Sequence, residues 1–136
     1  FVAGFIGSPK INMLQATIAH SNGVATARIA GMPAFVIPDL PTADPALTLC
    51  VRPASVQVGG GEVTAEGTIK LVEYLGSETL LHIALSSGQT LLVSDNGRTA
   101  YRMGDPVTIG FNLSDLHYFD SNGQRVEAVQ HESQAQ

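Results

Sequence analysis

Several residue types are scarce in this chain, and each scarcity excludes a class of protein. Its 136 residues include one cysteine, no tryptophan and only seven lysines and arginines against twelve aspartates and glutamates. A single cysteine cannot form an internal disulfide, which is compatible with a reducing compartment. The net charge of -5 and the lack of a basic cluster argue against a nucleic-acid interface. No run of about 18 apolar residues is present, so the sequence predicts no membrane-spanning helix.

Glycine and proline, in contrast, are frequent, with 14 and 7 residues, and only 14% of the residues are charged. This composition is typical of a compact, turn-rich β domain, and the length suits about one domain. Stretches of alternating apolar and polar residues are separated by turn signals at roughly 8 to 12 residue intervals. We predict an all-β fold, a small barrel of about nine short strands, for which ten stretches are candidates: residues 11–19, 24–30, 35–37, 48–52, 63–74, 79–86, 90–93, 107–111, 116–119 and 125–126.

The stretch 67–83 is expected to organise this barrel. From Val63 to Leu71 the apolar or small residues alternate with polar ones, which predicts a half-buried strand with Leu71 on the inner face. After Leu71 the alternation slips, which predicts a β-bulge or a strand that leaves one sheet for another. A tight turn at 75–77 then leads into a second strand, which is apolar enough on both faces to be central.

Turn residues mark the connections between these strands. Asn22-Gly23 predicts a two-residue hairpin, because both residues tolerate positive φ, and Asn122-Gly123 repeats the signal. Residues 55–62, which contain three consecutive glycines, are expected to be a mobile connector, and residues 38–45 a solvent-facing loop. Cys50 lies in an apolar run and is expected to be a small buried hydrophobe.

No catalytic pattern is strong in this sequence. There is no phosphate-binding glycine loop before a helix, and the histidines lack zinc-site spacing, being isolated at His20, His82, His117 and His131. Glu73 and Glu78 flank the central turn and are candidates for pairing across it, although carboxylates near a turn are usually solvated. His117 and Phe119 follow a Ser-Asp pair and are either presented at a loop or part of an edge strand whose aromatic ring fills the core. We therefore expect no catalytic, cofactor or metal site in this chain.

Five segments resemble one family. Residues 1–14 (FVAGFIGSPKINML) closely resemble F-V-A-G-F-I-G-S-P-x-M-N-F-L, which follows the nucleotide-binding domain in ATP-binding subunits of sugar-importing ABC transporters of the MalK-like group. Residues 49–53 (LCVRP) are similar to its L-G-[IV]-R-P-E, and residues 72–79 (VEYLGSET) to its V-E-x-L-G-x-E-T. Residues 104–107 and 115–120 (DLHYFD) resemble its closing signature. Cys50 replaces the family's usual glycine, and Ala54 replaces the glutamate after Arg52-Pro53.

The resemblance implies an OB-type, MOP-like barrel, the regulatory or TOBE region at the C-terminal end of such a subunit. Residues 1–9 would be the end of a linker helix from an upstream ATPase domain, residues 10–128 the regulatory domain and residues 129–136 a flexible polar tail. The resemblance implies a noncatalytic role in homodimerisation and in docking a cytosolic regulatory protein. ATP and Mg would be bound by the ATPase domain, which would also make the contact with the membrane permease subunits. The full subunit would be cytoplasmic, peripheral at the inner face of the cell membrane, and would serve an importer of sugars, polyols or glycerol-phosphate.

Six motif positions are the candidates for loop shape or for a partner surface: Arg52, Gly76, Glu78, Asp115, His117 and Phe119. For Arg52 and Gly76 the alternative is a purely structural role, the arginine paired with a carboxylate and the glycine at positive φ. Two other functions stay open. One is a molybdate-like oxyanion site with Lys70 and Ser77 as candidates. The other is an oligonucleotide-binding barrel, which the negative charge disfavours.

Overall fold

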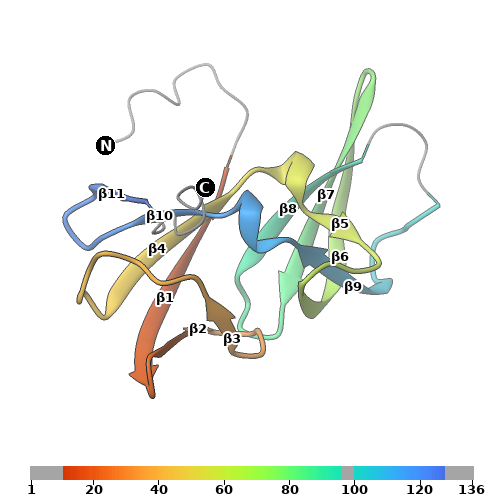
Figure 1. Ribbon diagram of the computed structural model, residues 1–136. Coiled ribbons are helices and arrows are strands. Elements are labelled where there is room, and N and C mark those ends of the chain that lie inside the picture. Colours follow the sequence, from red (N-terminus) through yellow and green to blue (C-terminus); the bar gives the residue numbers. More distant parts are fainter. Residues whose placement is uncertain (1–10, 96–99, 128–136) are drawn as a thin grey trace, which may run out of the picture.

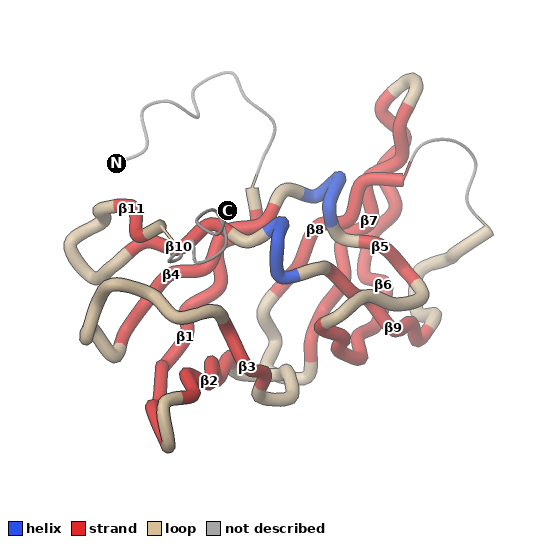
Figure 2. The backbone as a smooth tube through the Cα atoms, viewed as in Figure 1, coloured by secondary structure: helices blue, strands red, loops and turns tan. Residues whose placement is uncertain are grey.

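The computed structural model describes residues 11–95 and 100–127, which form two antiparallel sheets (Figures 1 and 2). The strands are β1 (Asn12–Ser21), β2 (Val24–Ile29), β3 (Phe35–Ile37), β4 (Ala46–Val51), β5 (Gln57–Val58), β6 (Val63–Leu75), β7 (Glu78–Leu85), β8 (Thr90–Asp95), β9 (Pro106–Phe111), β10 (His117–Phe119) and β11 (Arg125–Val126). Two 3-10 turns are η2 (Pro53–Ser55) and η3 (Leu113–Asp115). Sheet A has the order β11-β10-β4-β1-β2-β3 and sheet B the order β5-β9-β6-β7-β8. The all-β prediction is confirmed, and none of the described helices is long and apolar enough to cross a bilayer.

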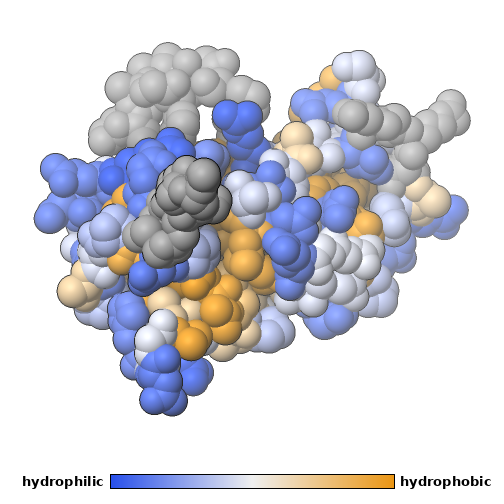
Figure 3. Space-filling model, viewed as in Figure 1, coloured by the Kyte–Doolittle hydropathy of each residue, from blue (hydrophilic) through white to orange (hydrophobic). Residues whose placement is uncertain are grey.

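The core lies between the two sheets, because each strand turns its apolar side chains inward. In β1 the alternation is regular, with Leu14, Ala16 and Ile18 buried and the residues between them exposed. Figure 3 shows apolar side chains near the middle of one face, surrounded by hydrophilic ones. The largest fully buried side chains come from both sheets and include Leu14, Leu47, Leu49, Ile69, Leu81, Ile83, Leu91, Ile109 and Phe111. Each such side chain contributes about 1.5 to 3 kcal/mol by leaving water.

The chain passes between the sheets through two similar crossovers. After β4 it turns through η2 into β5, and after β9 it turns through η3 into β10. The backbone hydrogen bonds correspond: Ser55 N–H donates to Arg52 C=O, and Asp115 N–H donates to Asn112 C=O. The crossovers hold the end of β4 and the start of β10 at the same side of the barrel, with β4 and β10 paired as neighbours.

A buried asparagine joins the sheets at the start of β1. Asn12, which is 5% exposed, donates from Nδ2 to the Leu92 carbonyl oxygen at 2.8 Å and accepts the Leu92 N–H on Oδ1 at 2.7 Å. The side-chain amide thus pairs with β8 as a neighbouring strand would. Gln89 adds a bond from its Nε2 to the Met13 carbonyl oxygen at 3.0 Å. We call the Asn12–Leu92 pair the inter-sheet clamp.

The β6–β7 hairpin stands out from the body of the barrel (Figure 1). Its pairing shifts between Ile69 and Leu71, which confirms a bulge in this stretch but places it just before Leu71 and not after it. Leu71 was expected on the inner face, and this expectation is wrong, because Leu71 lies beyond the register shift and is 42% exposed. β9 pairs with β6 only as far as Thr68, so the distal part of the hairpin has β8 beside β7 but not β9 beside β6. We call residues 71–82 the arm.

The turns follow their sequence signals in part. Asn22 and Gly23 both have positive φ, 54° and 79°, as the predicted two-residue hairpin requires. At Asn122-Gly123 only the glycine has positive φ, and Asp120 closes a longer loop by accepting the N–H groups of Asn122 and Gln124. The mobile connector expected over 55–62 contains the short strand β5, and the residues described form eleven strands where about nine were expected. The predicted helix end within 1–9 and the tail 129–136 lie outside the described residues.

Candidate functional site

The six candidate residues fall into two groups. Arg52, Asp115, His117 and Phe119 lie at the paired strands β4 and β10 or at the crossovers next to them. Gly76 is in the turn of the arm, and Glu78 is the first residue of β7. The first group is assembled from segments far apart in the sequence, whereas the second group is local.

The first group shares the outer face of sheet A. His117 is opposite Cys50 and Phe119 is opposite Thr48, while Tyr118 and its partner Leu49 point into the core. Since residues opposite each other on antiparallel strands share a face, His117 and Phe119 point outward. Both are half-buried. We call the surface formed by Thr48, Arg52, Asp115, His117, Phe119 and Arg125 the β4–β10 face, and Cys50 is buried beneath it.

Hydrogen bonding and charge fix the state of His117. The Arg125 Nη2 lies 2.8 Å from His117 Nδ1, and a guanidinium only donates, so Nδ1 must be the acceptor. Burial lowers the pKa of His117, and the positive charges of Arg125 and Arg52 lower it further against the opposing charges of Glu127 and Asp115. The imidazole is therefore neutral at pH 7 and carries its proton on Nε2.

The β4–β10 face is equipped for binding rather than for reaction. Cys50 is 1% exposed, and burial raises the pKa of its thiol, so the reactive thiolate is disfavoured. Arg52 is exposed, and Arg125 forms an ion pair with Glu127 at 2.9 Å. Guanidinium donors, a half-buried ring and a neutral imidazole are groups that protein interfaces use.

Glu73 and Glu78, which were candidates for pairing across the turn, each have another partner. Glu73 Oε1 lies 2.6 Å from His82 Nε2, and Glu78 Oε1 accepts the Ser94 hydroxyl at 2.5 Å. Both glutamates are on the outer face of sheet B, each with its own partner. Ser94 bonds to Glu78, and within the described chain the hydrogen bonds give no serine–histidine pair of the kind a nucleophile needs.

Gly76 shapes the turn of the arm, because its φ of 77° lies in the left-handed region. The side chains around it are largely apolar and exposed: Tyr74 is 68% exposed and Leu75 49%. Large exposed apolar residues grouped on one projecting element are typical of an interaction surface. The arm therefore presents exposed apolar area around its turn.

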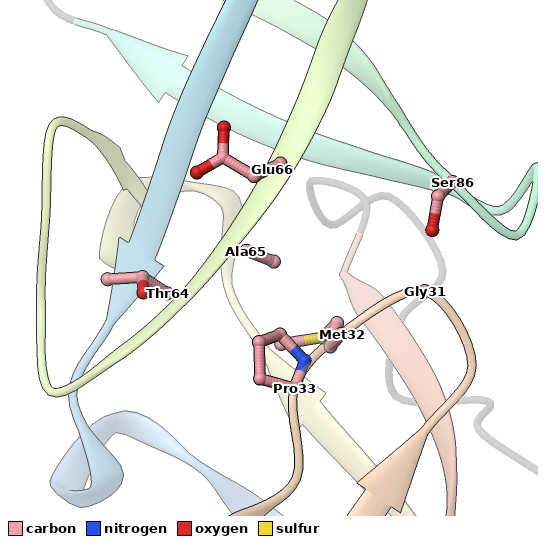
Figure 4. Close-up of a pocket in the computed structure, with 7 residues that line it drawn as sticks. All are labelled: Gly31, Met32, Pro33, Thr64, Ala65, Glu66 and Ser86. Atoms are coloured by element: carbon pink, nitrogen blue, oxygen red, sulfur yellow. The ribbon is translucent and has the colours of Figure 1, made fainter.

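A groove between the sheets has a volume of about 460 Å³ (Figure 4). It is lined by Gly31, Met32, Pro33, Thr64, Ala65, Glu66 and Ser86, none of which is cationic. Glu66 points from β6 towards β9, where its Oε2 accepts the Thr108 hydroxyl at 3.0 Å. A carboxylate without a cation disfavours an anion in this groove. Lys70 and Ser77, the oxyanion candidates, do not converge, because Lys70 is at the base of the arm in β6 and Ser77 is in the turn at its tip, after β6 ends at Leu75.

Two residues with clear roles were not among the candidates. Asn12 forms the inter-sheet clamp. The sequence signal for it was a polar residue at an inward position in a series that is otherwise apolar: Asn12, Leu14, Ala16, Ile18.

Asp44 Oδ2 accepts both the N–H and the hydroxyl of Ser121, and its Oδ1 accepts the Ala46 N–H. The pKa of Asp44 is lowered, first by the Ser121 hydroxyl. Asp44 thereby fastens the loop before β4 to the turn after β10, beside the β4–β10 face.

Comparison with known proteins gives three findings. The family model described as the TOBE domain matches residues 49–119. The sn-glycerol-3-phosphate import ATP-binding protein UgpC of Brucella abortus is 33% identical over 134 residues, which cover 93% of this chain and 34% of that protein. The alpha-glucoside transport ATP-binding protein AglK of Rhizobium meliloti is 34% identical over 134 residues, which cover 94% of this chain and 37% of that protein. The chain thus spans about a third of the length of these relatives.

The fold is also similar to that of a solved structure. The cytoplasmic molybdate-binding protein ModG, in a form with molybdate bound, superimposes with a TM-score of 0.65 at 13% sequence identity. The likeness covers 79% of this chain and 94% of that one. At this identity it supports the barrel fold alone.

Proposed function

Because the chain belongs to the TOBE domain family, we propose that it is the regulatory and homodimerisation domain of the ATP-binding subunit of an ABC importer. The importer would carry sugars, polyols or glycerol-phosphate, and the ATP-binding subunit would lie in the cytoplasm against the membrane permease subunits. The chain itself would be noncatalytic, with ATP and Mg bound by the ATPase domain of the same subunit.

One observation carries the proposal. Proteins named for glycerol-phosphate and alpha-glucoside import match more than nine tenths of this chain with only about a third of their own length. A domain that is one part of a transporter subunit does not need its own reaction site. The β4–β10 face and the arm offer contact groups in place of one.

The β4–β10 face is the surface we assign to a cytosolic regulatory protein. Arg52 and Arg125 supply guanidinium donors, the Nε2–H of His117 supplies a neutral donor, and Phe119 supplies apolar area. Arginine and aromatic residues are enriched in interface centres and dominate their binding energy. Asp115 and Glu127 limit the net positive charge of the face, which favours a partner of mixed charge over a strongly acidic one.

A chimera tests the transporter assignment. In the alpha-glucoside transport ATP-binding protein of Rhizobium meliloti, the region matched by this chain is replaced with the chain itself, and ATPase activity and alpha-glucoside uptake are measured. We expect the chimera to retain both, and a version that lacks the region to lose uptake. A chimera that folds and binds ATP but transports no better than the deletion would contradict the proposal.

The regulatory assignment has its own test on the same chimera. Arg52→Glu is expected to weaken regulator binding without changing ATPase activity, because it reverses one charge of the β4–β10 face. Arg28→Glu makes the same charge change on β2, outside that face, and serves as the matched control. Equal binding by both variants would remove the β4–β10 face as the docking surface.

The noncatalytic assignment is tested on the purified chain. We expect no nucleotide-saturable ATP hydrolysis, and measurable hydrolysis by the chain alone would contradict the noncatalytic assignment.

Titration calorimetry with molybdate, tungstate and sulfate tests the oxyanion alternative. We expect no heat of binding, because the groove has no cationic side chain and Lys70 and Ser77 do not converge.

A further inference from the structure

The outer edge of the arm has no strand beside it among the residues that the structure describes. β9 stops pairing with β6 at Thr68, and the loop leading into β9 makes its last backbone hydrogen bonds with Ile69. On the opposite side, residues 71–75 pair with β7. An edge of this kind presents unpaired N–H and C=O groups and is a ready template for another strand.

Proteins usually protect such edges with proline, a charge or a covering segment. The arm edge has no proline, and its one charged residue between 71 and 75, Glu73, is held by His82 of its own sheet. Its other large side chains are exposed, Leu71 by 42%, Tyr74 by 68% and Leu75 by 49%. An edge strand with three exposed apolar side chains and a single charged residue has the features of an interaction site.

We propose that two copies of this chain join along the arm edge, with residues 71–75 pairing antiparallel about a two-fold axis at Glu73. The inference rests on the proposed homodimerisation and names its surface. Opposite residues of an antiparallel pair share a face, so this register places Leu71 against the partner's Leu75 and Val72 against the partner's Tyr74. Each arm together with its β8 has three strands, so the pairing forms one six-stranded sheet.

The charges at the two ends of the edge select a second copy as the occupant. Lys70, at the base of the arm, is exposed and forms no ion pair with another described residue. Glu78, at the tip, is opposite Leu75 and so shares its outer face. Antiparallel pairing about Glu73 brings Lys70 of each copy near the partner's Glu78, which forms two equivalent ion pairs. A parallel copy or an unrelated strand does not make both contacts.

Glu73 opposes this association, because the axis places it beside the partner's Glu73 and like charges directly opposite are destabilising. The interface is also small, a five-residue edge with three exposed apolar side chains per copy. Interfaces below about 1,200 Å² are weak, so we expect a Kd on the order of 100 μM. Glu73→Gln is expected to tighten the dimer severalfold.

A charge swap tests the register. Lys70→Glu and Glu78→Lys are each studied by sedimentation equilibrium, alone and as an equimolar mixture. Each variant alone places like charges together twice and is expected to dimerise about tenfold more weakly. The mixture places opposite charges together twice and is expected to regain the affinity of the unaltered chain. Arg28→Glu, with the same charge change as Lys70→Glu on an exposed position of β2, is expected to leave the affinity unchanged.

A cross-link tests the axis. In a Cys50→Ala background, Glu73→Cys is expected to form a disulfide-linked dimer under mild oxidation, since residues at the axis lie about 4.5 to 5.5 Å apart. Residue 68 is exposed on the same strand but lies between β7 and β9, so the Thr68→Cys variant is expected to stay monomeric.

For the charge swap, Glu78→Gln is a second variant in case Glu78→Lys does not fold, because glutamine can keep the hydrogen bond from Ser94. It is expected to weaken the dimer about threefold.

The outcomes separate this inference from the proposed function. If the charge-swap variants dimerise with the affinity of the unaltered chain, or if their mixture dimerises no more tightly than each variant alone, the arm edge is not the interface. The proposed homodimerisation would still hold in that case. A chain that is strictly monomeric at millimolar concentration overturns both for the chain alone. Transport by the chimera would then still support the transporter assignment.

Discussion

The inter-sheet clamp makes a specific prediction about stability. Asn12→Leu keeps nearly the same side-chain shape and removes both hydrogen bonds to Leu92, at 2.8 and 2.7 Å. The Leu92 N–H and C=O are then left without these partners in a part-buried site, and each unsatisfied group costs about 1 to 3 kcal/mol. After the gain from the larger apolar surface, we expect a net loss of about 2 to 4 kcal/mol in the free energy of unfolding.

The measurement is urea unfolding followed by circular dichroism, with the slope of the transition unchanged and the midpoint lowered. The melting temperature should fall by about 10 °C. Gln89→Leu is the matched control, since it removes one inter-sheet hydrogen bond at a more exposed position, to the Met13 carbonyl oxygen, and should cost about 1 kcal/mol or less.

Asn12→Asp sharpens the same prediction through pH. The carboxylate keeps an acceptor for the Leu92 N–H but places an oxygen against the Leu92 carbonyl, so the folded state favours the protonated acid. The pKa of the new Asp is then higher in the folded state than its unfolded value of about 3.9. The contribution of the protonated acid to the free energy of unfolding is fully present below about pH 3.9 and is lost as pH rises through the folded pKa. An Asn12→Leu variant within about 0.5 kcal/mol of the unaltered chain, or an Asp variant more stable at pH 8 than at pH 4, would refute the clamp.

Three further predictions concern single side chains. Tyr118 is 4% exposed with no hydrogen-bond partner for its hydroxyl within the described residues, so Tyr118→Phe should be neutral or stabilise by up to about 1 kcal/mol in urea unfolding. Burial raises the pKa of Tyr118 to about 12, so the unaltered chain, unlike the variant, should lose stability at this site from about pH 10 to 12. The pKa of Asp44 is lowered by Ser121, so its stabilisation is present above the unfolded pKa of 3.8 and is lost as pH falls through the folded pKa. Asp44→Asn should flatten the acid limb of a pH–stability curve, and an unchanged limb would count against it. Gly76→Ala, at a φ of 77°, should cost about 1 to 2 kcal/mol of thermal stability, whereas Gly60→Ala, with open space at its Cβ, should cost little.

The sequence predicted the features of this fold that depend on neighbouring residues alone, such as turns and the buried face of a strand. Asn22-Gly23 specified a hairpin because two adjacent residues must adopt positive φ, and the alternation of β1 specified its buried face. The bulge near Leu71 was visible as a slip in the alternation of β6. The exposure of Leu71 was not predictable, because it depends on the register shift before Leu71 and on where β9 stops, which only the pairing of distant strands determines.

The missed features share that dependence on distant partners. β5 has two residues and no pattern of its own, and it is a strand because Gln57 and Val58 find Gly110 and Ile109 on β9. A Cβ on Gly110 would overlap the carbonyl oxygen of Gly60, and a Cβ on Gly61 would overlap the backbone of Phe111, so these two glycines allow the close approach of the connector to β9. Arg52 and His117 likewise lie near each other because β4 pairs with β10. Neither segment's sequence indicates that pairing partner.

The two surfaces of this domain belong to one rigid frame. Asn12 is opposite Val51, next to Arg52 of the β4–β10 face, and it bonds to Leu92 of β8. Leu92 is in turn opposite His82, the partner of Glu73 in the arm. Each step is a strand pairing, a peptide bond or a hydrogen bond, so the clamp is one connection between the two surfaces, beside the core that both sheets share. A regulator bound to the β4–β10 face, as we propose, would therefore be linked to the arm edge through both the clamp and the core.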